Sequence, residues 1–204
     1  MNVRFDRPDA HGTLLTAMSR RVEMGAAIRV ASVLLVAAMT AAAAQVSVPL
    51  PFTPVPFTLQ PMVVLLGGAA LGARLGMAAQ AVYLLAGIAG LPVFAASAVL
   101  PQGALRLLGP TGGYLMSYPF AAFLTGLLAQ RGFDRRYLTS VLAMGAGLLV
   151  IFTGGVTWLA LFAAPAVGFE AALRTGFYPF IPADIFKVLV AAAVMPAIWR
   201  LTRV

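Results

Sequence analysis

The chain has 204 residues, of which 61% are hydrophobic and 10% charged, and its formal net charge is +8. Soluble domains carry roughly 25% charged residues, so this composition excludes an ordinary soluble domain and indicates an integral membrane protein. Cysteine is absent, and the one histidine is His11 in the polar N-terminal region. Thiolate, zinc and Ser/His/Asp sites therefore lack their residues, and we expect no metal, no cofactor and no catalytic residue.

Six apolar runs predict an all-α membrane fold with six transmembrane helices. A helix needs about 20 residues to cross the hydrocarbon core, and the second run is shorter, so it is either a short helix among its neighbours or is extended by Val55–Leu59. We expect one membrane domain over residues 28–204, preceded by a polar cytoplasmic tail at residues 1–27. The predicted spans are Ile28–Val46, Gln60–Ala73, Leu75–Leu91, Gly113–Gln130, Tyr137–Phe162 and Phe180–Trp199.

The first run has a second interpretation. Arg20 and Arg21 precede an apolar stretch that ends in "AAAAQ", which is also the pattern of a signal peptide. Glu23 and Arg29 interrupt the approach to this stretch, and its length suits a retained helix. We therefore expect the run to be the first membrane helix.

The basic residues are unevenly distributed between the connections. Arg106 and Arg174 fall in outer connections, and Lys187 lies inside the last span. The asymmetry follows the positive-inside rule, so the charge indicates a topology with both termini cytoplasmic and does not indicate nucleic-acid binding. With that topology the other eleven basic residues are cytoplasmic: Arg4, Arg7, Arg20, Arg21, Arg29, Arg74, Arg131, Arg135, Arg136, Arg200 and Arg203.

The three outer connections carry the least regular sequences. The first, "VPLPFTPVPFTLQP" at residues 48–61, holds five prolines, and the others span residues 90–115 and 163–187. Proline fixes φ and lacks an N–H, so the first connection is neither a helix interior nor a central strand. Irregular backbone at membrane depth is tolerated only where it is buried in protein or lines a cavity. We therefore expect these loops to form a ligand pocket at the outer face.

Four motifs in these connections resemble the BioY family: "PVPFTLQP", "GLPVF", "GPTGGYL" and "IPADIFK". Their order and spacing extend the resemblance from Ile28 to Trp199. BioY proteins are biotin-specific membrane subunits, called S components, of energy-coupling-factor (ECF) vitamin transporters. The resemblance implies six helices, biotin bound near the outer face, and a first outer loop folded into the site. One departure is Ala95-Ala96-Ser97, where we would expect a glycine-rich turn.

The resemblance implies a high-affinity biotin-binding subunit that mediates uptake in the bacterial cytoplasmic membrane. Its partners would be biotin, the lipid bilayer, the transmembrane coupling subunit (T component) and ATPase subunits. No Walker motif occurs in this chain, so we expect no ATPase or other enzymatic activity. The alternatives are an S component for another vitamin, or a self-contained channel or secondary transporter. Channels repeat polar residues along several spans, whereas charges within spans here cluster near one face.

Asp184 and Lys187 are the strongest candidate binding residues. They are three residues apart and share one face of the last helix. Charges within a span face a partner or a cavity, so the two residues form either a self-neutralising ion pair or a ligand site, and both interpretations can hold together. Biotin has two ureido N–H groups, which Asp184 can accept, and carbonyl and carboxylate oxygens, to which Lys187 can donate.

The outer connections supply six further candidate binding residues, each with a structural alternative. Gln102 either binds ligand or caps a turn. Aromatic residues such as Trp158 pack either on a bicyclic ligand or in the core and interfacial belt. Gly112 and Gly113 are expected to permit a tight turn into the fourth helix. The six candidates are Thr58, Phe94, Gln102, Thr111, Tyr114 and Tyr178.

Small residues and one charge pair complete the predictions. Gly68, Gly72 and Gly76 are expected to pack spans two and three together, and Glu170 with Arg174 to form a surface pair. Small residues also allow close helix approach in lipid, and four alanines share one face of the first helix. The BioY family uses an Ala-x-x-x-Ala pattern there to contact the T component, although abundant alanine can produce such a stripe by chance. These alanines are Ala27, Ala31, Ala38 and Ala42.

Overall fold

The structure is a computed structural model that describes residues 12–14, 26–96, 102–163 and 165–202. Most of the predicted tail at residues 1–27, with His11, Arg20 and Arg21, lies outside the described residues. Ser97 of the departing turn also lies outside them.

The described residues contain six helices of twelve residues or more, each within three residues of a predicted span. Two short helices, α5 (Leu105–Leu108) and α8 (Phe169–Gly176), and a 3₁₀ turn, η1 (Phe133–Arg135), lie in the connections. The fold is therefore mostly helical, as predicted. The six helices are α2 (Ala26–Gln45), α3 (Gln60–Leu71), α4 (Ala73–Ile88), α6 (Gly112–Gln130), α7 (Tyr137–Leu161) and α9 (Ile181–Thr202).

Among the described residues, α2, α7 and α9 are long and apolar enough to cross a membrane. The helices α3 and α4 are apolar but shorter. The 12 residues of α3 rise about 18 Å, which is less than the roughly 30 Å of a hydrocarbon core. The second predicted span is therefore a short helix among longer neighbours, and residues 57–58 before it form a strand instead of extending it.

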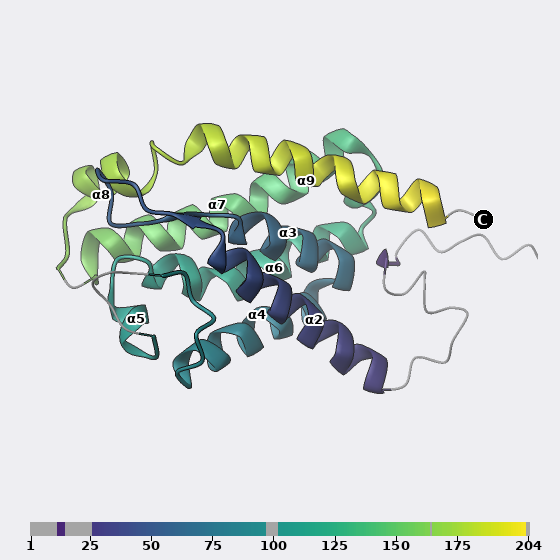
Figure 1. The fold of residues 1–204 in the computed structure, drawn as a ribbon. Helices are drawn as coiled ribbons and strands as arrows, with labels where there is room; N and C mark the ends of the chain where they lie inside the picture. Colours follow the sequence, from purple (N-terminus) through teal and green to yellow (C-terminus); the bar gives the residue numbers. More distant parts are fainter. Residues whose placement is uncertain (1–11, 15–25, 97–101, 164, 203–204) are drawn as a thin grey trace, which may run out of the picture.

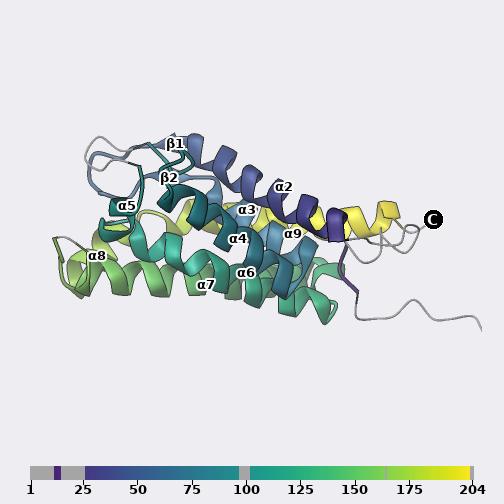
Figure 2. The same ribbon diagram turned by 90° about the horizontal axis from the view of Figure 1, so that it is seen from below.

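The helices form one bundle in which α6 is central. It packs against α3, α4 and α7, while α2 lies on α3 and α4 and α9 lies on α3 and α7. Figures 1 and 2 show the start of α2 and the end of α9 at one end of the bundle. The helices α5 and α8 lie at the opposite end, with the short strands β1 and β2. The three irregular connections therefore gather at one end, which we call the loop end.

The proline-rich first connection is closed by two short strands. β1 (Ser47–Val48) pairs antiparallel with β2 (Phe57–Thr58), so that Ser47 faces Thr58 and Val48 faces Phe57. Four prolines lie between these strands, where the chain is irregular. The sequence did not predict the pair, because two residues per strand are too few to show a period of two.

Glycines bring α3, α4 and α6 close together. A Cβ on Gly68 of α3 would lie 2.5 Å from the carbonyl oxygen of Ala122 in α6. A Cβ on Gly76 of α4 would lie 2.8 Å from the Cα of Gly68. Gly72 has a φ of 84°, a conformation that glycine adopts without strain, and it separates α3 from α4. The prediction that this series packs two spans is confirmed for Gly68 and Gly76, and the contact extends to α6, whereas a Cβ on Gly72 would meet Gln130 and Thr13.

At the other end of the bundle, Asp134 ties the α6–α7 connection to α9. Its Oδ2 atom accepts a 2.6 Å hydrogen bond from the indole nitrogen of Trp199, and the Arg135 guanidinium lies 4.7 Å from the Trp199 ring centroid. Burial raises the pKa of Asp134 above its ordinary value, and the Trp199 hydrogen bond opposes that rise. This contact joins the two chain segments at the end opposite the loops.

We expect Gly68→Ala to destabilise the bundle, because the added methyl group meets backbone atoms of α6 that cannot move independently. Overpacking of this kind costs about 1–3 kcal/mol, and the melting temperature in detergent should fall measurably. Gly145→Ala in α7 is the matched control, since its Cβ would meet no atom within 4 Å. Equal melting temperatures for the two variants would contradict a close α3–α6 contact.

Candidate functional site

A cavity lies at the loop end of the bundle. Its empty space is about 640 Å³, a volume that includes open solvent at its mouth. Its walls come from all three irregular connections and from α3, α6, α7 and α9. The lining residues are Val55, Pro56, Thr58, Gln60, Pro61, Phe94, Ala95, Arg106, Thr111, Tyr114, Leu115, Tyr118, Ile151, Phe152, Phe180, Asp184 and Lys187.

Asp184 and Lys187 form the charged wall of this cavity, one and two turns into α9. They are only 4% and 6% exposed. The Lys187 ammonium donates 2.6 Å hydrogen bonds to Asp184 Oδ1 and to the backbone oxygen of Thr58. It also lies 3.7 Å from the centroid of the Phe57 ring. The ion pair and the position at a cavity are therefore both present, and the ligand contacts of these residues stay a prediction.

The pair keeps hydrogen-bonding capacity for a ligand. An ammonium group has three N–H donors. Two of them donate to Asp184 and Thr58, and a ligand oxygen would compete for the third with the Phe57 ring, which lies 3.7 Å away. Asp184 accepts the lysine bond through Oδ1, and its Oδ2 has no hydrogen bond within the described part of the chain. The wall can therefore offer one acceptor and one donor side by side.

Arg106 is a second cation in the lining, which the sequence placed only in an outer loop. The residue is 5% exposed, and its guanidinium donates a 2.9 Å hydrogen bond to the oxygen of Ala95. Its Nε is buried and has no hydrogen-bond partner among the described residues. Burial lowers the pKa of Arg106 because desolvation disfavours the charged form. One sign of a special role for Arg106 is visible in the sequence, namely its position in an outer connection against the positive-inside trend.

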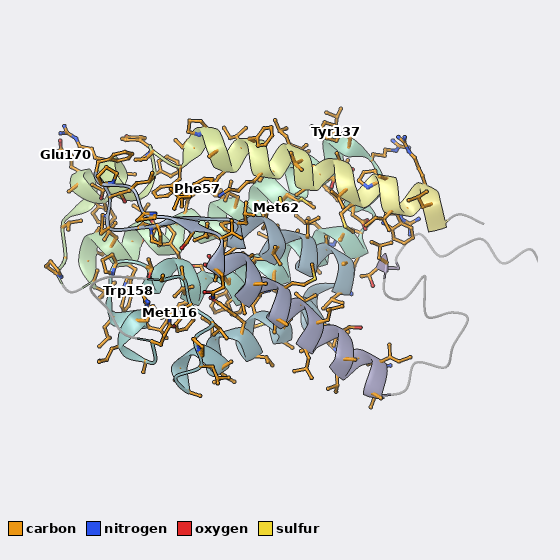
Figure 3. The ribbon with its side chains drawn as sticks, in the orientation of Figure 1. Phe57, Met62, Met116, Tyr137, Trp158 and Glu170 are labelled. Atoms are coloured by element: carbon orange, nitrogen blue, oxygen red, sulfur yellow. The ribbon has the colours of Figure 1, made fainter. Side chains whose placement is uncertain are left out.

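Six of the eight predicted binding residues line the cavity: Thr58, Phe94, Thr111, Tyr114, Asp184 and Lys187. Gln102 lies outside the lining and donates a 3.2 Å hydrogen bond to the oxygen of Phe94, which matches the turn-capping alternative. Tyr178 also lies outside the lining and is 56% exposed. Trp158, which is labelled near the loop end in Figure 3, donates to the oxygen of Gly109 and does not line the cavity.

The sequence missed Gln60 and most of the apolar wall. Gln60 is the first residue of α3 and lines the cavity. In the sequence it stands at the start of an apolar run, where nothing indicates a binding role. Residues such as Tyr118 and Phe152 come from the middle of helices whose apolar periodicity does not distinguish a cavity from a core. Only the packing of distant segments brings these side chains together.

Side chains hold three consecutive backbone carbonyls in the segment that carries Phe94. The donors and acceptors are Tyr83 to Val93 (3.3 Å), Gln102 to Phe94 (3.2 Å) and Arg106 to Ala95 (2.9 Å). The Phe94 ring stands edge-on to Tyr83, with centroids 5.6 Å apart, and a Cβ on Gly87 would overlap it. The aromatic wall of the cavity is thus fixed by hydrogen bonds to the backbone of the segment that carries it.

Two hydroxyl groups hold the end of α8 over the cavity wall. Tyr114 donates a 2.7 Å hydrogen bond to the oxygen of Gly176, and Thr53 donates a 2.6 Å bond to the oxygen of Thr175. The first connection, α6 and α8 are joined in this way. On the outer side of α8, Glu170 points away from the bundle in Figure 3 and pairs with Arg174 at 2.7 Å. The predicted surface pair is confirmed.

Gly112 and Gly113 act through close packing. Neither has a positive φ, and both already belong to α6. A Cβ on Gly112 would overlap the backbone of Leu107, and one on Gly113 would overlap Trp158. The chain does turn tightly into α6 as predicted, since the Gly112 N–H donates a 3.1 Å hydrogen bond to the oxygen of Gly109. The glycines permit this turn through close packing, and no positive φ is needed there.

The alanine stripe of α2 faces outward. Ala27, Ala31, Ala38 and Ala42 are all exposed. The stripe does not pack inside the described bundle, and its contact with a partner stays a prediction. The buried face of α2 consists of Val36, Ala37, Thr40, Ala43 and Ala44.

Comparison with known proteins bears on this site. The profile of the BioY family matches residues 16–204. This chain belongs to the BioY family. A probable biotin transporter BioY of Pyrococcus horikoshii is 43% identical over 165 residues, which cover 81% of this chain and 92% of that protein. The biotin transporter BioY of Thermotoga maritima is 40% identical over 71% of this chain and 81% of its own length.

The fold also matches a solved structure, the S component for biotin from an ECF-type ABC transporter. The TM-score is 0.74 at 24% identity, over 87% of this chain and 95% of the other. At that identity the match shows a common fold. The resemblance read from the four sequence motifs is thus confirmed, and a family of transport subunits, which are not enzymes, agrees with the expectation of no enzymatic activity.

Proposed function

We propose that this chain is the biotin-binding S component of an ECF transporter in the cytoplasmic membrane. Membership of the BioY family and the names of its relatives support this proposal. The observation that carries it is a cavity at the loop end whose lining combines an acceptor, two cations and aromatic rings. Biotin offers N–H donors, oxygens and an apolar bicycle to match these groups.

Charge complementarity supports a monoanionic ligand. The charged lining residues are one acid, Asp184, and two bases, Lys187 and Arg106. The charge of Lys187 is balanced by that of Asp184. The charge that remains in the lining is the single positive charge of Arg106. Buried charges are costly when unpaired, and one ligand carboxylate would balance the Arg106 guanidinium.

We assign the ligand contacts as follows. Asp184 accepts a ureido N–H, and the remaining N–H of Lys187 donates to a ligand oxygen. The guanidinium of Arg106, which lines the cavity, donates to the valerate carboxylate. Phe94 and Phe152 pack on the fused rings.

The membrane topology belongs to the same proposal. All six long helices cross the bilayer or lie within it, the loop end faces outward, and both termini are cytoplasmic. Arg131, Arg136 and Arg200 lie near the end opposite the loops, which is the side that the positive-inside rule places in the cytoplasm. The proline-rich loop, already closed by β1 and β2, would lose little conformational entropy when ligand binds.

We predict that biotin binds with one molecule per chain and raises the melting temperature of the detergent-purified protein, because a ligand that binds only the native state stabilises it. Riboflavin and thiamine, added at equal concentrations, should leave the melting temperature unchanged. Absence of a biotin shift, or an equal shift with another vitamin, would overturn the assignment of the ligand.

The roles of Asp184 and Lys187 are separable by mutation. If the pair only neutralises itself, the double variant Asp184→Asn/Lys187→Met keeps biotin affinity, because no unpaired charge remains. We expect the double variant to fold and to lose affinity. In the single variant Asp184→Asn, loss of a charge-assisted hydrogen bond costs about 1.5–3 kcal/mol, or about ten- to a hundredfold in Kd. Calorimetric titration checks this, with the melting temperature as the control for folding.

We further propose that the exposed alanine stripe of α2 contacts the T component. Its exposure supports this, and small residues permit the close helix approach that drives association in lipid. We predict that Ala31→Trp and Ala38→Trp keep biotin affinity and reduce co-purification with the coupling module. Val30→Trp, at a position 56% exposed outside the stripe, is the control. Equal loss of biotin binding and co-purification would assign the stripe to folding.

A further inference from the structure

Tyr83 is a buried polar residue behind the cavity wall. It lies on α4, is 1% exposed and does not line the cavity. Its hydroxyl makes two hydrogen bonds, at 2.6 Å with Nε2 of Gln60 and at 3.3 Å with the backbone oxygen of Val93. One hydrogen-bond partner is enough to satisfy a tyrosine hydroxyl in a protein core. Because Tyr83 has two, the two bonds together determine which groups donate and which accept.

The direction of both bonds follows from the donor inventory. A carbonyl oxygen only accepts, so the single hydroxyl proton of Tyr83 goes to Val93. The hydroxyl can then only accept from Gln60, which must turn its amide nitrogen toward Tyr83. The two ends of a glutamine amide cannot be distinguished by shape, and the hydrogen-bond network decides between them. Here the orientation that satisfies both contacts, and that the structure adopts, turns Nε2 of Gln60 toward Tyr83.

The opposite end of the Gln60 amide is available to the cavity. Gln60 lines the cavity, and its backbone is held at the start of α3, where its N–H bonds Thr58 Oγ1 at 3.4 Å. Oε1 of Gln60 has no hydrogen-bond partner among the described residues. It is not among their fully buried unpaired atoms, so it keeps some accessible surface. The cavity therefore meets a hydrogen-bond acceptor at this position.

We infer that Tyr83 is a positioning residue that fixes Gln60 with its amide oxygen toward the cavity, so that the site selects a ligand with an N–H group there. The inference rests on the proposed function for the identity of the ligand. A cyclic urea has two N–H donors on opposite sides of one carbonyl. Asp184 and Gln60, from α9 and α3, would each accept one of them. A ligand with a hydrogen-bond acceptor in place of either N–H would face an oxygen of Asp184 or Gln60 and could not form that hydrogen bond.

A double-mutant cycle tests this inference. Tyr83→Phe keeps the ring that packs on Phe94 and removes the hydroxyl, so the Gln60 amide can rotate and present its nitrogen. We expect the Kd for biotin to rise about tenfold. In a Gln60→Met background, Tyr83→Phe should change the Kd less than twofold, because neighbours that act through one contact are not additive. Tyr137→Phe, at the opposite end in Figure 3, should have no effect.

The outcomes separate the inference from the proposed function. The same loss from Tyr83→Phe in both backgrounds, or wild-type affinity in the single variant, would overturn the positioning role. Failure of the wild-type chain to bind biotin would instead overturn the proposed function. The orientation is then still testable by NMR of the side-chain amides of the five glutamines. The Gln60 resonance, identified by its loss in Gln60→Met, should shift in Tyr83→Phe, and an unshifted resonance would overturn the inference.

Discussion

The ammonium group of Lys187 lies buried inside an apolar bundle, and the arrangement of the loop end depends on the partners that surround it. Three groups surround it: the carboxylate of Asp184, the backbone oxygen of Thr58 and the ring of Phe57. The first belongs to the same helix, whereas the other two belong to β2. A charge in a membrane span needs such partners. By supplying them, the proline-rich loop becomes part of the bundle.

This constraint explains why the first connection is both irregular and fixed. A helix would satisfy its own carbonyls, so the Thr58 oxygen is free for Lys187 only because the chain there is a short strand. Prolines between β1 and β2 prevent a helix and limit the conformations of the open loop. Thr53 in the same loop binds the end of α8. The loop therefore crosses the mouth of the bundle with contacts on both sides.

Behind the cavity, the bundle provides rigidity through close packing and satisfied polar groups. Gly68 and Gly76 allow α3, α4 and α6 to approach at backbone distance, which holds the helices that carry Gln60 and Tyr114. The side chains of Tyr83, Gln102 and Arg106 bind carbonyls of the loop that carries Phe94. In a low-dielectric interior an unpaired carbonyl is costly, so each of these bonds opposes movement of the loop. The groups that line the cavity are consequently held in place by the protein itself.

The sequence by itself predicted the six long helices, their ends to within three residues, and the connections that line the cavity. Apolar runs and prolines mark those boundaries because hydrocarbon excludes unpaired backbone groups. The spacing of Asp184 and Lys187 fixed them on one face, since three residues span almost one helical turn. The alanine stripe of α2 was likewise visible as a period, although only packing showed that its face is exposed.

Only the tertiary structure decided which residues meet. The contacts of Gln60, Tyr83 and Arg106 depend on how separate elements pack together, which no local pattern in their segments shows. The same is true of Gln102 and Tyr178, which share the composition of the binding loops yet lie outside the cavity. The local sequence shows which polar groups are costly to bury in the membrane. The packing of the whole chain decides which partner each of these groups meets.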